Sequence, residues 1–174
     1  MAQWDAEDRV PRALIDPIRE MGVCEMTVPE EYGGIGRDIL GTMVTVEELS
    51  RRSMVIATIY LMNACYGSMN ILASGSEVQK TRLLPKLAAG ELLFAYGLSE
   101  PDVGSDLASV KTRAERRGDS VVINGSKRWC SGAEIADYIY ALVRTGPEDA
   151  RYKNLSLVLI PPDAPGVSLT HIPA

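Results

Sequence analysis

The spacing of hydrophobic residues changes from a helical period to a strand period about halfway along the chain. In residues 39–52 apolar side chains recur mostly three or four positions apart, which predicts an amphipathic helix. Residues 55–73 are apolar on nearly every side, and this predicts a buried helix at the centre of the fold. Polar residues interrupt that run, so we expect a core helix rather than a membrane span: Asn63, Ser68 and Asn70.

Shorter helices are predicted on either side of these two. Residues 12–21 form a helical candidate whose regularity is limited by Pro17. Ser76-Glu-Val-Gln79 has the form of a capping box, in which the serine oxygen and the glutamine side chain satisfy free backbone donors. This signal predicts a helix that runs to about Ala89 and ends at Gly90.

The segments after residue 91 have the length and composition of strands. They are residues 92–98, 111–117, 120–123, 138–144 and 155–160. Asn124-Gly125 is a strong signal for a two-residue hairpin turn, so residues 126–131 are expected to form the returning strand. We therefore predict an α+β fold, with an N-terminal helical domain over residues 1–92 and an antiparallel β-sheet or barrel domain over residues 93–174.

The composition is that of an acidic globular chain. Of the 174 residues, 46% are hydrophobic and 24% are charged, which allows a core in one ordinary domain or two small ones. The net charge of −5 argues against nucleic acid as the main partner. A basic group in the second half would still suit an acidic ligand; it comprises Lys111, Arg113, Arg116, Arg117, Lys127 and Arg128.

The cysteines do not suggest a cross-linked or metal-bound framework. Cys24, Cys65 and Cys130 are far apart and odd in number, and His171 is the single histidine. A disulfide scaffold or a zinc site is therefore not expected. The acidic first residues lack the apolar centre of a signal peptide, so the expected localisation is cytoplasmic.

Residues 96–106 and 127–132 carry the most distinctive chemistry. Hydroxyl side chains, closely spaced glycines and one tryptophan lie there, at what are predicted to be strand ends of one sheet. This combination suits a planar ligand with polar edges better than a packed core. Each feature also has an ordinary explanation, since serines cap turns and Glu100 and Asp106 would simply anchor a loop.

Four motifs, in order and correctly spaced, resemble those of the acyl-CoA dehydrogenase family. The first is the loop over residues 28–34, Val-Pro-Glu-Glu-Tyr-Gly-Gly, and the second is the helix over residues 79–87. Residues 96–106 and 127–132 are similar to the family's two flavin-binding stretches. The resemblance covers the chain from about residue 12 to its end. It implies a flavoprotein oxidoreductase of fatty acid and lipid metabolism that uses FAD for α,β-dehydrogenation of an acyl-CoA thioester.

The resemblance also implies partners and cofactor-binding residues. It implies a homo- or hetero-oligomer that passes electrons to an electron-transfer flavoprotein. The implied cofactor-binding residues are Tyr96, Leu98, Ser99, Gly104, Ser105, Trp129, Cys130 and Ser131.

Individual roles follow from what a reduced flavin requires. Backbone N–H groups near Leu98 and Ser99, with the Ser99 hydroxyl, would stabilise negative charge on its N1–C2 edge. Trp129 would exclude water from the ring, and Ser131 would approach the N5 edge. Gly104 would let the backbone come close to the ligand.

Ser105 would lie where the flavin and the CoA part of the substrate meet. The basic group and Lys153-Asn154 are weaker candidates for contacts with CoA. Tyr32 is expected to pack its loop rather than to contact ligand.

The chain departs from the family pattern in sequence and in length. Ser99 and Ser131 stand where threonine is usual, and Gly132 stands where asparagine is common. The family's C-terminal helical domain, which carries the catalytic glutamate, is not expected within these 174 residues, so no catalytic residue is assigned. A chain that worked unaided would have to take its base from Glu30, Glu31, Glu100 or Asp102.

Other interpretations share the same motifs. They are a catalytically silent partner subunit, a fragment that needs a second chain, and a flavin monooxygenase or oxidase of the same fold. We expect the isolated chain to bind FAD weakly or not at all, to show no turnover, and to self-associate or need a partner. Residues 55–73 and 138–144 are the expected contributors to an exposed apolar face.

Overall fold

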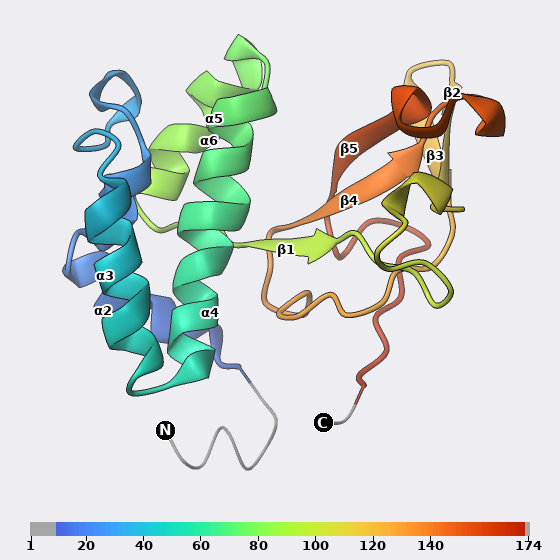
Figure 1. Cartoon of the computed structure of the whole chain (residues 1–174). Helices are drawn as coiled ribbons and strands as arrows, with labels where there is room; N and C mark the ends of the chain where they lie inside the picture. The colour runs from blue at the N-terminus through green and yellow to red at the C-terminus, as the bar shows by residue number, and fades with distance from the viewer. Residues whose placement is uncertain (1–9, 173–174) are drawn as a thin grey trace.

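Helices occupy the first half of the chain and strands the second (Figure 1). The computed structural model describes residues 10–172. The helices are α2 (Ile15–Glu20), α3 (Ile39–Ser50), α4 (Met54–Asn63), α5 (Asn70–Ser74) and α6 (Glu77–Ala88), with a π-helical turn, η4 (Ala64–Met69), between α4 and α5. Short 3-10 turns are η1 (Arg12–Leu14), η2 (Val23–Thr27), η3 (Glu30–Tyr32), η5 (Leu107–Ser109) and η6 (Glu148–Asn154). The strands are β1 (Phe94–Gly97), β2 (Arg113–Arg117), β3 (Ser120–Asn124), β4 (Tyr138–Arg144) and β5 (Leu155–Ile160).

The run from α4 through α5 is the central helix that the sequence predicts. Ile59, Tyr60 and Met62 are fully buried in it. Within the described residues, Met54–Ser74 is the one helix long and apolar enough to cross a membrane, but half of its apolar window is buried inside the molecule. Burial of this kind is typical of a core helix.

Helix α3 forms where predicted but exposes much of its apolar surface. Thr42 is its one buried residue, whereas Leu40, Met43 and Val44 are 76%, 65% and 51% exposed. Hydrophobic spacing shows which side chains share a helix face, but not whether a neighbour covers that face.

The prediction that residues 55–73 and 138–144 contribute to an exposed apolar face was wrong. Residues 55–73 and 138–144 contain none of the large exposed hydrophobic side chains. Both segments are covered by their neighbours, because α4 packs against α3 and β4 lies between β1 and β5.

Helix α6 begins with the predicted capping box. Ser76 N donates to Gln79 Oε1 at 2.8 Å, and Gln79 N donates to Ser76 Oγ at 3.3 Å. The Tyr32 hydroxyl donates to Glu77 Oε2 at 2.9 Å, which ties the loop over residues 28–34 to the first turn of the helix. Tyr32 thus packs its loop, as expected.

The five-stranded sheet is mixed, with β4 at its centre. Strand β1 pairs with β4 in parallel, Phe94 opposite Tyr138, and β5 pairs with it antiparallel. Strand β2 meets β4 at a single parallel pair, Arg113 and Arg144, and forms an antiparallel hairpin with β3. The α+β class is confirmed, while the antiparallel arrangement holds for two of the pairings only. A long connection separates β1 from β4, and this is what parallel neighbours require.

The hairpin turns at Gly118-Asp119, so the prediction of a turn at Asn124-Gly125 was wrong. Arg117 pairs with Ser120, and Gly118 adopts a left-handed φ of 62°. At Gly125 a side chain would collide with Thr112, so glycine is needed there for close packing of two segments. Residues 126–131 form no strand and instead pass beside the end of β1.

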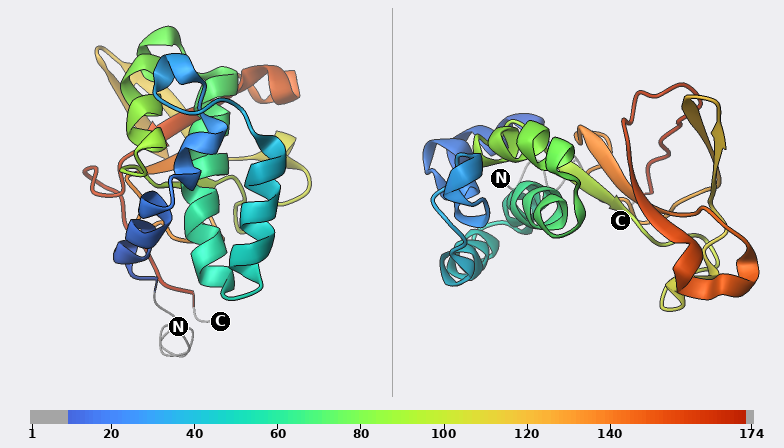
Figure 2. Two further views of the ribbon diagram at one scale, coloured as in Figure 1. Left: turned by 90° about the vertical axis from the view of Figure 1, so that its left-hand side faces the viewer. Right: turned by 90° about the horizontal axis from the view of Figure 1, so that it is seen from above.

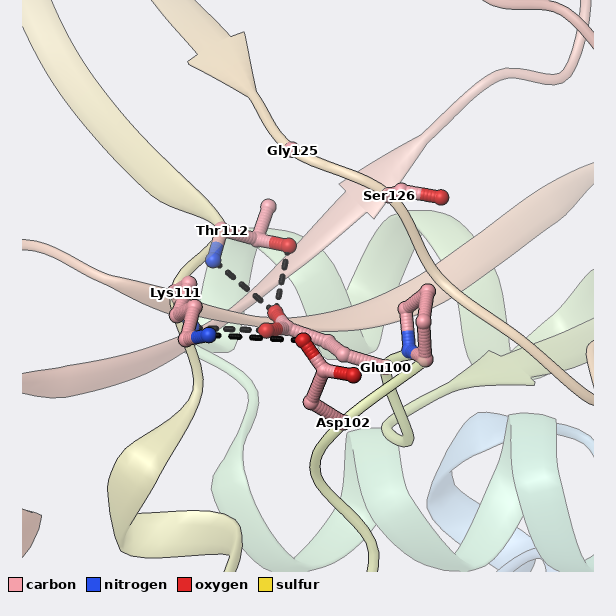
Figure 3. A pocket seen from close by; sticks show the side chains of 7 residues that line it. Glu100, Asp102, Lys111, Thr112, Gly125 and Ser126 are labelled. Atoms are coloured by element: carbon pink, nitrogen blue, oxygen red, sulfur yellow. Dashed lines mark hydrogen bonds and ion pairs between the residues drawn. The ribbon is translucent and has the colours of Figure 1, made fainter.

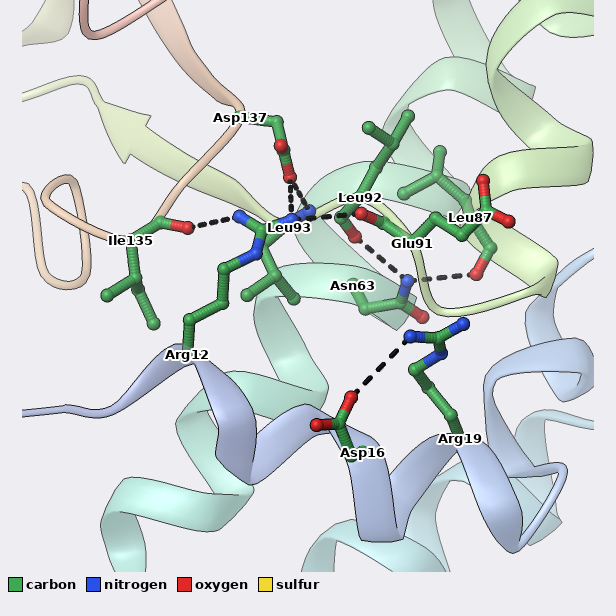
Figure 4. Close-up of polar contacts among 10 residues, drawn as sticks. All are labelled: Arg12, Asp16, Arg19, Asn63, Leu87, Glu91, Leu92, Leu93, Ile135 and Asp137. Carbon is green, nitrogen blue, oxygen red and sulfur yellow. Dashed lines mark hydrogen bonds and ion pairs between the residues drawn. The ribbon is translucent and has the colours of Figure 1, made fainter.

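One carboxylate joins the start of the sheet to the first helical turn (Figure 4). Asp137 Oδ2 accepts hydrogen bonds from Leu93 N and Arg12 Nη2, each at 2.8 Å, and Asp137 N donates to Leu93 O at 2.8 Å. Arg12 also donates to the carbonyl oxygens of Ile135 at 2.6 Å and Glu91 at 2.9 Å. The first residues of β1 and β4 are thereby held together beside η1.

The helical and β halves are joined by a shared hydrophobic cluster, next to a second cluster around α6. Seen from above, they lie side by side, and β1 runs from one into the other (Figure 2). The buried cluster draws on both halves: Ile15, Ile59, Met62, Leu93, Ile139 and Val143. The site at the end of β1 is therefore positioned by a continuous packed interior.

Charged residues on α3 should reduce self-association of the chain. Leu40 and Met43 lie one turn apart on an exposed helix face, and contiguous apolar surface favours association. We expect Leu40→Lys/Met43→Glu to lower the fraction of dimers and larger species in sedimentation velocity, with an unchanged circular dichroism spectrum. Val78→Glu, at an isolated position on α6 that is 77% exposed, is the matched control. Equal association of wild type and double variant would exclude this face as the contact.

Candidate functional site

The two stretches singled out in the sequence meet at the end of β1. Arg128 N donates to Ser99 O at 2.9 Å, and Lys127 Nζ donates to Leu98 O at 3.1 Å. Residues 98–99 and 127–128 are therefore neighbours in space. This contact places Ser99 and Trp129 on adjoining segments.

The buried carboxylate of Glu100 directly follows Ser99 in the chain, and Figure 3 shows it bonded to Lys111 and Thr112. Glu100 Oε2 accepts from Lys111 N at 2.7 Å, and Oε1 accepts from Thr112 N at 2.9 Å, Thr112 Oγ1 at 2.5 Å and Lys127 Nζ at 2.9 Å. The side chains of Glu100 and Lys127 are 5% and 11% exposed. Burial by itself would raise the pKa of Glu100, but the hydrogen bonds outweigh it and lower the pKa to about 2. Glu100 anchors its loop as an ionised group.

Tyr96 is held by the π-helical turn. The Tyr66 ring stacks on it with centroids 4.0 Å apart, and the Tyr140 centroid lies 6.1 Å away. Asn70 Nδ2 donates to the Tyr96 hydroxyl oxygen at 2.6 Å. Because that oxygen is the acceptor in this bond, its own proton is directed elsewhere. Single π-helical turns frequently occur at functional sites, and this one carries Tyr66 onto Tyr96.

Trp129 combines an exposed ring with an unusual backbone. Its φ of 63° is left-handed, which is uncommon for a bulky residue, and the side chain is 61% exposed. Arg128 Cζ lies 4.4 Å from the ring centroid. Cys130 is half-buried against the core, and Ser131 is exposed. A flat apolar ring displayed in this way is suited to stacking on a planar ligand.

Gly104 and Ser105 lie on an exposed loop. A side chain at Gly104 would meet no protein atom within 4 Å, so the chain itself does not require glycine there. Asp106 accepts from Ser109 Oγ at 2.5 Å and pairs with Arg151 at 3.2 Å. Asp106 thus anchors the end of the loop, and Ser105 precedes it.

The basic group does not converge on one point. Lys127 is largely covered, with 11% of its side chain exposed, whereas Lys111 and Arg117 are exposed and pair with Asp102 at 3.4 Å and Glu115 at 3.3 Å. These contacts are typical of solvated surface charges.

Lys153 and Asn154 differ from each other in environment. Lys153 is exposed, while Asn154 is buried and accepts from Arg144 Nη1 at 2.9 Å through Oδ1. Arg144 also donates to the carbonyl oxygens of Ala108 and Val110. The Asn154 side-chain oxygen thus orients Arg144, which in turn binds the backbone within and directly after η5.

The remaining candidates for metal or redox chemistry stay apart. Among the side chains that the structure describes, no three metal-binding groups come together. Cys24, Cys65 and Cys130 are free thiols, and burial raises the pKa of each, that of Cys24 to about 11. His171 is exposed.

Several residues that hold the site together carried little signal in the sequence. Lys127 stood out only as the first residue of the second stretch and as one of the basic residues, and Asn70 only as an interruption of an apolar run. The one available clue was charge, since Glu100 and Lys127 carry opposite signs within two motifs that were expected to adjoin. Thr112 carried no such clue.

Two family profiles match the chain in succession. The one described as "Acyl-CoA dehydrogenase, N-terminal domain" matches residues 1–91, and "Acyl-CoA dehydrogenase, middle domain" matches residues 95–174. The chain is 37% identical over 161 residues to acyl-CoA dehydrogenase FadE29 of Mycobacterium tuberculosis, covering 92% of this chain and 41% of that protein. It is 34% identical over 173 residues to glutaryl-CoA dehydrogenase of Desulfococcus multivorans, covering 98% and 44%.

A solved structure shows the same arrangement. A chain in the structure described as "Electron transferring flavoprotein of Acidaminococcus fermentans: Towards a mechanism of flavin-based electron bifurcation" matches with a TM-score of 0.87 and 32% identity, covering 94% of this chain and 43% of that one. The present chain therefore spans less than half the length of these relatives.

Acid should destabilise the fold through Glu100. The pKa of Glu100 is lowered in the folded state from an ordinary 4.5 to about 2. Its ionisation therefore stabilises the folded state fully above pH 4.5, and this stabilisation is lost as the pH falls towards 2. The shift corresponds to roughly 3 kcal/mol of unfolding free energy. We expect urea denaturation between pH 7 and pH 2.5 to show this loss in the wild type.

The matched variant for this experiment is Glu100→Gln, which cannot ionise. It should be less stable than the wild type at pH 7 and should show a smaller decline on acidification. An identical decline in both proteins would contradict the assignment of acid sensitivity to Glu100.

Proposed function

The chain belongs to the acyl-CoA dehydrogenase family, and from this premise we propose that the protein is an FAD-dependent oxidoreductase that dehydrogenates an acyl-CoA thioester between its α and β carbons. The observation that carries the proposal is the contact of Arg128 N with Ser99 O at 2.9 Å. It brings a hydroxyl-bearing strand end and an exposed tryptophan together. A polar donor and a flat apolar ring both suit a flavin, which is planar with polar edges.

The described residues fit a flavin. Among them no hydrogen-bond partner of the Ser99 hydroxyl is found, so it is available to a ligand. The indole of Trp129 is exposed, and Gly104 borders open space. When bound, FAD supplies a hydride acceptor.

The roles of the chain's own groups are to bind, to orient and to exclude water. The backbone around Leu98 and Ser99, with the Ser99 hydroxyl, donates to the pyrimidine edge of the ring. Trp129 covers one part of the ring and Ser131 borders another. Ser105 contacts the CoA part of the substrate. The Tyr96 hydroxyl oxygen accepts from Asn70, which leaves its own proton to donate to a further acceptor.

Glu100 is unsuited to act as the base that removes the α-proton. A general base works best with a pKa near the operating pH, and the pKa of Glu100 is about 2. Both of its oxygens are also engaged by donors. Glu30 and Glu31 are exposed on η3, and Asp102 is exposed beside Lys111.

We further propose a domain boundary near residue 92, supported by the change from α6 to β1 there. The proposed electron acceptor is an electron-transfer flavoprotein, in a cytoplasmic oligomer. The similar Acidaminococcus fermentans structure is described as that of an electron-transferring flavoprotein, which supports this choice. The exposed face of α3 is a candidate contact for oligomer formation.

Anaerobic mixing with acyl-CoA tests the reaction. We expect a flavin-containing assembly of this chain to lose its flavin absorbance when an acyl-CoA substrate is added without oxygen. Short, long, branched and sterol-derived acyl chains should be compared. Failure of all of them to bleach the flavin would contradict the dehydrogenase. Rapid oxidation of the reduced flavin by O₂ would favour the oxidase or monooxygenase interpretation instead.

The 174-residue chain by itself should retain little FAD and show no turnover. Ligand pockets usually bury most of a ligand's surface in about 300–1,000 Å³. Trp129, Ser105 and Ser131, which are expected to contact the flavin or the substrate, are instead all exposed on this chain. Flavin content after gel filtration measures this. Stoichiometric flavin on a monomer with turnover would support a self-sufficient enzyme.

Two single substitutions separate binding from redox tuning. Trp129→Ala should weaken flavin retention, because it opens part of the ring to water. Ser99→Ala should lower the flavin reduction potential more than it weakens binding, since a hydrogen bond to a charged group is worth about 1.5–3 kcal/mol. Spectroelectrochemical titration of flavin-containing protein gives the potentials. Equal potentials in wild type and Ser99→Ala would show that this hydroxyl does not face the ring.

A further inference from the structure

The ion pair between Glu100 and Lys127 joins the two halves of the candidate site. Its atoms are 2.9 Å apart, and the side chains are 5% and 11% exposed. Glu100 directly follows Ser99, and Lys127 lies two positions before Trp129. The pair therefore sits immediately behind both residues that are expected to face the ligand.

Stability alone is a poor explanation for such a pair. Removing two charges from water costs about as much as their attraction returns, and apolar replacements of buried pairs are often neutral or stabilising. What the pair does supply is geometry. Lys127 Nζ reaches Leu98 O as well as Glu100, while Glu100 binds Lys111 N and Thr112 N. The residues that follow β1 and those that precede β2 are thus fixed relative to Lys127.

The residues directly before and after Trp129 are both held in place. Arg128 N is bonded to Ser99 O, and Cys130 O accepts from Ala133 N at 3.1 Å while its side chain packs against the core. Trp129 itself takes the left-handed conformation between these fixed neighbours. Strained conformations of this kind persist only where the surrounding structure over-determines them.

We propose that Glu100 and Lys127 are positioning residues that set the spacing between Ser99 and Trp129 and keep Trp129 in its left-handed conformation with the indole displayed. The pair acts through the Leu98 carbonyl and the Arg128 amide and does not itself contact the ligand. Only the statement that the displayed indole meets a flavin rests on the proposed function. The geometric part is independent of it.

Amide hydrogen exchange on the wild-type chain gives the first test. The proposal requires Arg128 N–H, which bonds Ser99, to be protected and to open together with Lys111 N–H and Thr112 N–H, which bond Glu100. Exchange of the Arg128 amide at the rate of an exposed amide, with Lys111 and Thr112 still protected, would overturn the proposal. No substitution is needed for this measurement.

The second test removes the charges in a chain whose only tryptophan is Trp129. Trp4 is the other tryptophan of the sequence, so Trp4→Phe leaves a single indole N–H resonance. In that background, Glu100→Gln/Lys127→Met keeps an acceptor for Thr112 and leaves no unpaired buried charge. We expect the protection of Arg128 N–H to fall at least about tenfold and the indole resonance to shift or broaden, while core helix amides are unchanged.

Two further variants control the experiment. Lys111→Met removes a nearby charge that pairs with Asp102 at the surface, 74% and 78% exposed, and it should leave the Arg128 amide and the indole resonance as in the wild type. Lys127→Arg keeps a charged donor and should restore much of the protection lost in the double variant. A folded double variant with wild-type values for both readouts would overturn the proposal. If the double variant does not fold, the proposal is decided by the wild-type exchange data and by the protection of the Arg128 amide in Lys127→Arg.

Flavin retention provides a separate readout. In flavin-containing protein, the double variant should lose flavin faster than Lys127→Arg does. If the wild type takes up no flavin, the proposed cofactor role fails, but the exchange and indole measurements still decide the positioning role.

Discussion

The hydrogen bonds of Asp137 are the constraint on which the rest of the structure depends. Parallel neighbours such as β1 and β4 have no short turn between them to fix their register, so another interaction must do so. Asp137 exchanges backbone and side-chain hydrogen bonds with Leu93, and the same carboxylate holds Arg12 from the first helical turn. Both strands and the helical half are fixed at one point, and everything further along β1 is placed relative to it.

The other end of β1 is fixed by a second carboxylate, that of Glu100. The strand between the two is only four residues long, so little movement is possible between them. The two carboxylates differ in environment: the side chain of Asp137 is 28% exposed, whereas that of Glu100 is 5% exposed. Because charged contacts near water contribute little to stability, the importance of Asp137 lies in register. Glu100 operates in a drier environment, where its bonds orient Lys127 and the start of β2.

Local rules predicted the elements well and the long-range pairing poorly. The capping box at Ser76 and the helices depend on neighbouring residues, and they formed where the sequence indicated. The turn signal at Asn124-Gly125 failed because glycine is needed at position 125 for a different reason. Gly125 packs closely against Thr112, which a local turn signal does not involve. The exposure of Leu40 could not be predicted either, since a helical pattern defines a face without defining its neighbour. For the site, motifs located both stretches, but the pairing of Glu100 with Lys127 emerges only from the fold.

The places where the backbone departs from ordinary geometry gather around the same two stretches. Among the described residues, the non-glycine positions with positive φ are Trp129 and Arg151. Trp129 lies in the second stretch, and Arg151 pairs with Asp106 at the end of the first. The π-helical turn contributes Tyr66, which stacks on Tyr96 at the beginning of that first stretch. Sequences usually agree with their structures at every level, and exceptions concentrate where function requires them. The strained backbone, the helix irregularity and the ion pair of Glu100 with Lys127 therefore all lie around the end of β1, where the sequence predicts the ligand site, and they support that prediction without reference to known enzymes.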